Sequence, residues 1–226
     1  MSRNGLSRQG LIRDPQADSP LVRSYVTLFE QVSVTVGSDE GAPVIVVTSP
    51  SRGDGRSTVA ANLAICAAAL GGCRTLAVDA DLDRPGLSKL LGSSGKPGLA
   101  DVLAGKAECE EFTKPVGHGN LALLPAGRGS SPLIVAQARR VRELVGIWRS
   151  RFDWIVVDSP PMLVSAAAAV LAKAASGALL VLRAGRTRPE VLDAALARLD
   201  EGCIRTLGAV LNRRRFAIPT GRYRRL

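Results

Sequence analysis

The chain has 226 residues, which suggests one sizeable domain with tails, and 46% of them are hydrophobic, as is usual for a globular core. Its formal net charge of +10 favours anionic partners such as nucleotides, nucleic acid or an acidic membrane surface. The basic amino terminus lacks the apolar run of a signal peptide, and no apolar stretch is long enough to cross a bilayer. The four cysteines form no C-x-x-C pair. We therefore expect a cytoplasmic protein.

A polar segment precedes the first predicted helix. Residues 1–18 contain few apolar side chains, so we expect a mobile tail there. Over residues 19–36 apolar side chains recur at helical spacing, with Ser19 suited to cap the helix and Pro20 to its first turn. After a turn, the run VIVVT at residues 44–48 is short, β-branched and uninterrupted, which is typical of a central parallel strand.

Strand and helix patterns then alternate along the rest of the chain. The runs that predict strands lie at residues 74–81, 121–127, 153–161, 177–185 and 206–212. The patterns that predict helices lie at residues 57–72, 86–92, 99–105, 131–152, 164–175 and 187–202. This alternation predicts an α/β fold, with a doubly wound, mostly parallel sheet covered by helices on both faces. We place this domain at residues 19–212, followed by a basic carboxyl-terminal tail at 213–226.

A glycine-rich segment, SPSRGDGRST at residues 49–58, connects the first strand to the next helix. That context makes a phosphate-binding loop credible, because Gly53 and Gly55 let backbone N–H groups converge on phosphate oxygens at a helix amino terminus. Ser57 occupies the position whose hydroxyl normally binds magnesium. The strict motif has glycine at Pro50 and lysine at Arg56, so the match fails twice. The nucleotide-binding candidates are Gly53, Asp54, Gly55, Arg56, Ser57 and Thr58.

Acidic residues end two later strands. Asp79 and Asp81 close the strand that follows the loop helix, and Asp158 closes WIVVD. In a parallel sheet these carboxyl ends open on one edge, where ligands bind. Carboxylates beside a hydroxyl and a phosphate are the hard oxygen ligands that magnesium prefers, so the ordered set predicts a nucleotide site with a metal.

These segments resemble motifs of the bacterial tyrosine kinases, the cytoplasmic autokinases that regulate capsule and exopolysaccharide assembly. That family's Walker A segment is similar to TSPSRGDGRSTVAANLA, its second acidic motif to TLAVDADLDRPGLSKLLG, and its Walker B segment to FDWIVVDSPP. Its closing strands resemble LVLRAGRTRPE and LGAVLN. The resemblance covers residue 19 to about residue 212 and implies the P-loop NTPase fold.

The resemblance also implies cofactors and residue roles. It implies ATP and Mg²⁺, with Ser57, Asp81 and Asp158 around the metal and Asn212 near the base. It makes Asp79 or Asp81 the carboxylate that activates a tyrosine hydroxyl, while Arg56 takes the place of the lysine that faces the phosphates. Transfer itself rests on positioning and charge stabilisation.

Arg56 is the departure from the family pattern that bears most directly on catalysis. A planar guanidinium does not replace a compact ammonium conservatively at a tight site, although it still pairs with phosphate oxygens. We therefore expect phosphotransfer to be weakened while nucleotide binding survives.

Other departures lie outside the loop. Asp83 stands where the family often has arginine in its acidic motif. The self-association pattern E-x-x-R-x-x-R is absent, because its positions hold Arg23, Val26 and Phe29, and the oligomeric state stays open. The tyrosine-rich tail is also absent, which leaves Tyr223 as the candidate phospho-acceptor.

The leading hypothesis is an ATP-binding tyrosine-kinase-like protein of capsule or exopolysaccharide synthesis or export. The alternative is a non-catalytic nucleotide-binding scaffold or regulator of a membrane-embedded polysaccharide chain-length protein, a co-polymerase, which the resemblance implies as the partner in either case. The basic tail is suited either to anionic lipid at the inner face of the cell membrane or to solubility. A partition- or MinD-like ATPase is less favoured, because Ser51 stands where those proteins have an additional lysine early in the loop. Nucleic acid is for the same reason an unlikely partner.

Overall fold

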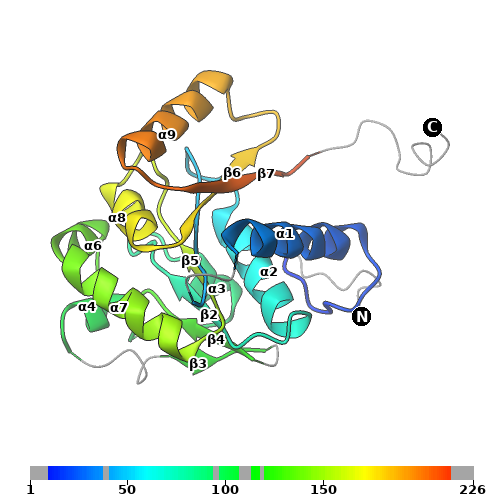
Figure 1. The fold of residues 1–226 in the computed structure, drawn as a ribbon, viewed down its shortest axis with the longest axis horizontal. Helices are drawn as coiled ribbons and strands as arrows, with labels where there is room; N and C mark the ends of the chain where they lie inside the picture. The colour runs from blue at the N-terminus through cyan, green and yellow to red at the C-terminus, as the bar shows by residue number, and fades with distance from the viewer. Residues whose placement is uncertain (1–9, 38–40, 94–96, 107–112, 118–119, 215–226) are drawn as a thin grey trace.

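A seven-stranded sheet forms the centre of the molecule (Figure 1), as seen in a computed structural model that describes residues 10–37, 41–93, 97–106, 113–117 and 120–214. The strand order is β3-β4-β2-β5-β1-β6-β7, and every neighbouring pair is parallel except β3 and β4. The strands are β1 (Val44–Thr48), β2 (Thr75–Asp79), β3 (Lys114–Pro115), β4 (Leu121–Leu124), β5 (Trp154–Asp158), β6 (Gly177–Arg183) and β7 (Thr206–Asn212). The predicted mostly parallel sheet is therefore confirmed.

Helices cover both faces of this sheet, as Figure 1 shows. One face packs against α1 (Pro20–Val36), α2 (Arg56–Ala69) and α3 (Leu87–Leu90). The other packs against α4 (Leu99–Leu103), α6 (Ser131–Ala136), α7 (Ala138–Arg151), α8 (Ala166–Ala174) and α9 (Pro189–Glu201). This arrangement confirms the expected three-layer α/β/α fold. Within the described ranges no helix is long and apolar enough to span a membrane.

The continuous apolar strands follow from this double cover. In β1, Val44 and Val46 face one core cluster while Ile45 and Val47 face the other, so all five residues of the strand are buried. Alternate side chains of a strand point to opposite faces, and a strand covered on both faces therefore reads as an uninterrupted apolar run. The burial of β1 fixes the position of the loop that follows Thr48.

Two expectations about elements differ from the structure. The helix expected over residues 131–152 is two helices, because the backbone at Gln137 leaves helical geometry at φ −103° and ψ 28°. Ile134 in α6 and Val141 in α7 are seven residues apart and both are buried, so the apolar period continues across the break and does not reveal it. The short antiparallel edge strand β3 was not predicted.

The amino-terminal segment is more closely packed than expected. The Ile12 side chain is fully buried, and its N–H donates to Asn62 Oδ1 at 2.9 Å. The Asn62 amide in turn donates to the Gly10 carbonyl oxygen at 2.9 Å. We expected a mobile tail over residues 1–18, whereas residues 10–18 lie within the described part of the chain and Ile12 joins the core that also contains α1 and α2.

Candidate functional site

The loop between β1 and α2 has the backbone that a phosphate site requires. Gly53 and Gly55 have φ values of 84° and 98°, which favour glycine. Space also requires glycine at position 55, since a Cβ there would lie 2.1 Å from Asn212 Nδ2. The α2 amino terminus has no side-chain cap, so its first N–H groups are available to a ligand.

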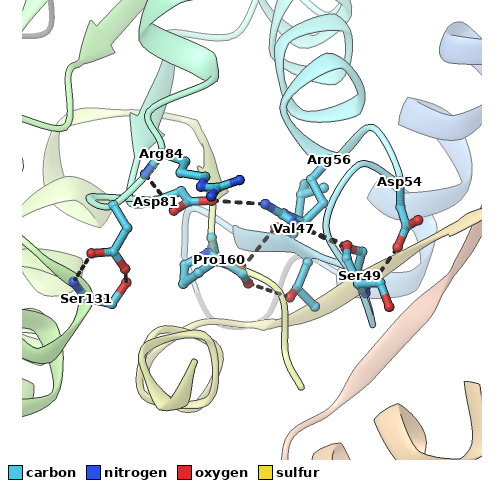
Figure 2. Close-up of polar contacts among 12 residues, drawn as sticks. Val47, Ser49, Asp54, Arg56, Asp81, Arg84, Ser131 and Pro160 are labelled. Atoms are coloured by element: carbon cyan, nitrogen blue, oxygen red, sulfur yellow. Dashed lines mark hydrogen bonds and ion pairs between the residues drawn. The ribbon is translucent and has the colours of Figure 1, made fainter. Parts of the chain in front are cut away.

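Internal hydrogen bonds hold this loop in place. The buried Asp54 carboxylate accepts a hydrogen bond from the Ser51 N–H at 3.1 Å, a contact visible in Figure 2. The Asp54 carbonyl oxygen accepts one from Asn212 Nδ2 at 2.8 Å, and Asn212 Oδ1 accepts one from the Arg213 N–H at 2.8 Å. Both ends of the Asn212 side-chain amide therefore contact protein, and in this structure the residue ties the end of β7 to the loop.

Arg56 is buried and is held by three acceptors. Its Nη2 lies 3.0 Å from Asp81 Oδ2, and both side chains are less than a tenth exposed. Its Nη1 donates to Ser49 Oγ at 3.0 Å and to the Ser51 carbonyl oxygen at 3.3 Å. Figure 2 shows this side chain lying between the loop and the acidic motif. The guanidinium that replaces the motif lysine is thus already occupied by protein groups.

The two strand-end carboxylates Asp79 and Asp158 lie side by side, because they are register partners in β2 and β5. Asp79 Oδ2 accepts hydrogen bonds from the Ser88 N–H and hydroxyl, each at 2.7 Å. Burial raises the pKa of Asp79 to about 6, although the Ser88 bonds oppose it. Complete burial, with the Asp79 carboxylate nearby, raises the pKa of Asp158 to about 8.

Several polar atoms of this site are buried without a hydrogen-bond partner among the described residues. They are Arg56 Nε, Asp79 Oδ1 and both carboxylate oxygens of Asp158. Buried polar groups in folded proteins are nearly always paired, so orphaned atoms at one place need an explanation. Oxygen atoms of this kind fit a hydrated cation, which supplies the missing donors.

The predicted magnesium ligands are only partly brought together. Ser57 and Asp158 both lie near Gly86, where a Cβ would be 2.3 Å from Ser57 Oγ and 3.9 Å from Asp158 Oδ2. Asp81 instead pairs with Arg56. In the described ranges, no three His, Cys, Asp or Glu side chains are close enough to hold a metal by themselves. The residues fit magnesium only as part of a nucleotide complex, in which phosphates complete the coordination.

Some residues of the site were not found from the sequence. Ser88 holds Asp79, Gly86 leaves room for Ser57, and Ser49 binds Arg56. These serines and the glycine lie within the motif segments, but nothing in their spacing indicates these contacts. Thr58 lies beside the amino-terminal segment, since a Cβ at Gly10 would be 3.8 Å from Thr58 Cγ2. The predicted acceptor Tyr223 lies outside the described residues.

The departures noted in the sequence have internal roles. Asp83 accepts hydrogen bonds from the N–H and the hydroxyl of Ser131, which links the acidic motif to α6. Phe29 packs edge-on against Trp154 with ring centroids 5.0 Å apart, and Val26 contacts the same core. Two positions of the family's self-association pattern therefore pack within the core of this chain.

Comparison with curated proteins finds tyrosine kinases. The chain is 30% identical over 196 residues to tyrosine-protein kinase YwqD of Bacillus subtilis, covering 86% of this chain and 81% of YwqD. It is 32% identical over 170 residues to tyrosine-protein kinase Wzc of Salmonella typhimurium, covering 75% of this chain and 24% of Wzc. The chain thus spans about a quarter of the length of the first curated relatives it matches. No protein-family model matches the chain.

Solved structures give the same grouping. The kinase domain of the Escherichia coli tyrosine kinase ETK superposes with a TM-score of 0.73 at 26% identity, covering 89% of this chain and 78% of that domain. The septum site-determining protein MinD of Pyrococcus horikoshii, complexed with Mg-ADP, gives a TM-score of 0.65 at 27% identity, with 81% and 76% covered. The core fold is thus similar both to kinase domains and to an ATPase-like nucleotide-binding protein.

Proposed function

Because the chain belongs to the bacterial tyrosine-protein kinase family, we propose that it binds ATP with Mg²⁺ at the loop of residues 49–58 and transfers phosphate to tyrosine slowly. The observation that supports this most is the loop itself. Its left-handed glycines and uncapped helix amino terminus lie beside the carboxylates of Asp79, Asp81 and Asp158.

Different groups around the loop would bind the phosphates and the metal. Backbone N–H groups from Gly53 to Thr58 would hold the phosphates, and the Ser57 hydroxyl and Asp158 would hold the metal, directly or through water. Magnesium, when bound, neutralises charge that develops on the transferred phosphate. The bond from Asn212 to the Asp54 carbonyl oxygen would hold the loop in its observed conformation when the ligand binds.

Proton transfer falls to a carboxylate of the acidic motif. Asp79 and Asp81 both have pKa values raised by burial, which makes each a better proton acceptor than an ordinary aspartate once it is ionised. Asp81 is a little exposed, whereas Asp79 is fully buried and held by Ser88. Asp81 is therefore the proposed base that accepts the tyrosine proton, and Asp79 positions the site beside it.

Arg56 accounts for the proposed slow transfer. Its guanidinium has to leave Asp81 before it can face a phosphate, so ATP competes with a buried ion pair. The same exchange frees Asp81 for proton transfer. Positioning errors of about 1 Å can cost on the order of a hundredfold in rate, and a forked side chain in the place of lysine is such an error.

The second candidate is a nucleotide-binding scaffold or regulator without phosphotransfer. It is favoured by the occupied Arg56 and by Tyr25, one of only two tyrosines in the chain, which is 7% exposed and unsuited to accept phosphate in the folded state. The remaining candidate acceptor is Tyr223. In both cases we propose capsule or exopolysaccharide assembly as the setting, with a membrane-embedded co-polymerase as partner and the basic tail at the inner face of the membrane.

Calorimetry and phosphotransfer separate these possibilities. ATP titrated into the folded full chain should release or absorb heat with Mg²⁺ and much less without it. No heat with Mg²⁺ would contradict both candidates. Radiolabelled ATP should then label the chain slowly, and Tyr223→Phe should abolish the label. ATP binding without any label, on this chain or on an added tyrosine substrate, would favour the scaffold.

A further inference from the structure

A cavity of about 610 Å³ lies beside the phosphate loop, at the carboxyl ends of β6 and β7. Its described lining consists of Arg183, Ala184, Gly185, Arg186, Arg213 and Arg214. Four of these six residues are arginines, and none of the six is acidic. Like charges at one place repel one another, so a cavity of this composition is stabilised by an anion.

The backbone around the cavity is well fixed. Arg183 is the register partner of Asn212, and the Ala184 N–H donates to the Asn212 carbonyl oxygen at 2.9 Å. The Arg183 N–H donates to Thr187 Oγ1 at 2.9 Å, and the Arg186 N–H to the Arg183 carbonyl oxygen at 3.1 Å. The arginines therefore project from a turn and a strand end that are tied together.

Two of these arginines reach the loop. Arg183 Nη1 lies 3.5 Å from the Gly53 carbonyl oxygen, and Arg186 Nη1 would lie 3.4 Å from a Cβ placed on Gly53. Within the described chain, Arg183, Arg186 and Arg213 form no ion pair with a carboxylate. No carboxylate of the described residues therefore neutralises their charge.

The strand order separates this cavity from the carboxylates. Asp79 and Asp158 end β2 and β5 on one side of β1, whereas Arg183 and Arg213 lie at the ends of β6 and β7 on the other side. A nucleotide with its metal-bound phosphates toward the carboxylates would extend its nucleoside end toward the arginines. An unmodified nucleoside is neutral and has no charge to compensate the guanidinium groups of Arg183, Arg186 and Arg213.

We propose that Arg183, Arg186, Arg213 and Arg214 form a second anion site that binds a phosphoryl group other than those held by the loop. The phosphoryl group has two possible sources with the same chemistry. It is carried on the ribose of the nucleotide in the loop, which rests on the proposed nucleotide site, or it belongs to a free polyphosphate. Arginine pairs with phosphate oxygens bidentately, and this suits either source.

Matched nucleotides test the first source. Calorimetry on the full chain compares AMP with adenosine 3′,5′-bisphosphate and adenosine 2′,5′-bisphosphate, which differ from AMP only by one phosphate on the ribose. We expect at least one bisphosphate to bind 10-fold or more tightly than AMP. Arg186→Gln and Arg213→Gln should each reduce this ratio to below 3-fold, while Arg198→Gln, an exposed arginine of α9, should leave it unchanged.

Tripolyphosphate tests the second source. It is titrated into the chain saturated with Mg-ATP, so that the loop is filled. The site is assigned to free polyphosphate if tripolyphosphate binds, if Arg186→Gln and Arg213→Gln each abolish this binding, and if AMP and its bisphosphates bind with equal affinity. The proposal is overturned if the parent chain binds neither the adenosine bisphosphates nor tripolyphosphate more tightly than the Arg186→Gln variant does.

The two proposals fail separately in these titrations. ATP binding without any arginine-dependent gain from extra phosphate would leave the proposed function standing and remove the second site. Arginine-dependent tripolyphosphate binding by a chain that does not bind ATP would do the reverse. Thermal unfolding of each variant checks that it is folded before titration.

Discussion

Replacing Arg56 by lysine should raise phosphotransfer and lower stability at the same time. Arg56 uses two ends of its guanidinium, Nη2 toward Asp81 and Nη1 toward Ser49 and the Ser51 carbonyl oxygen. An ammonium group is a single point charge and cannot occupy both places. Arg56→Lys therefore leaves one set of contacts unmade, which frees either Asp81 or the loop for the ligand.

The structure sets the size of both effects. A hydrogen bond to a charged group contributes about 1.5–3 kcal/mol, and this is the cost that ATP has to offset when it displaces Arg56 from Asp81. Removing that cost corresponds to a gain in ATP affinity or transfer rate of roughly 10- to 150-fold. The lost contacts should lower the free energy of unfolding by ~1–2 kcal/mol, and thus the Tm by several degrees for a chain of this size.

The assay measures autophosphorylation and thermal unfolding on the same preparations. Arg74→Lys is the matched control, because Arg74 also pairs with an aspartate, Asp153, but at an exposed place at the opposite ends of β2 and β5. We expect the control to leave the rate unchanged. A folded Arg56→Lys variant with an unchanged or lower rate, while ATP still binds, would refute the view that the Asp81 pair restrains catalysis.

Three further changes test other parts of the site and core. Asp158→Asn should stabilise the ligand-free protein near pH 8. In the parent, the pKa of Asp158 is about 8 in the folded state, so the native protein keeps a proton that the unfolded chain has lost, and its stability falls as pH rises from about 4 to 8. The variant should lack this fall when unfolding is measured at several pH values. Gly86→Ala should weaken Mg-ATP binding and cost about 1–3 kcal/mol of stability, because its methyl group would press on Ser57. The control Gly146→Ala, inside α7 with open space around it, should leave Mg-ATP binding unchanged in calorimetry and raise the free energy of unfolding by about 0.5–1 kcal/mol, because alanine is the better helix former. Ile12→Ala should lower the free energy of unfolding by about 2–5 kcal/mol in denaturant titrations, since this side chain is fully buried, and a loss below 0.5 kcal/mol (about the scale of a surface change) would show that the segment does not belong to the core.

Strand positions could be predicted because burial on both faces removes polar residues from the sequence. The run VIVVT and the strand that ends at Asp158 are apolar up to their last residue, and both are covered by helices on each side. The loop could be predicted because the backbone at Gly53 and Gly55 requires positive φ, which leaves a visible glycine spacing. In each case the physical requirement acts on residue type within a short segment.

Contacts between distant residues left no such trace. Arg56 and Asp81 are 25 positions apart, and their pairing depends on the direction of a long side chain across the edge of the sheet. Ile12 lies in a short apolar pair with Leu11 inside a polar stretch. The Asn62 side-chain amide accepts a hydrogen bond from the Ile12 N–H and donates one to the Gly10 carbonyl oxygen. Composition predicted a mobile tail there because it averages over residues, whereas one buried side chain and two hydrogen bonds fix the segment.

The charges at the carboxyl edge of the sheet are sorted by strand, and neither half is balanced by protein alone. On the side of β2 and β5, burial raises the pKa of Asp79 to about 6 and that of Asp158 to about 8, and a cation beside them would favour their charged forms. On the side of β6 and β7, Arg183, Arg186 and Arg213 lack carboxylate partners within the described chain. The proposed metal-bound polyanion would compensate both halves together if it lay across β1, with its cation toward the carboxylates and its excess negative charge toward the arginines. The Arg56–Asp81 pair lies at the same edge, and its opening on nucleotide binding, as proposed above, would release Asp81 as the base.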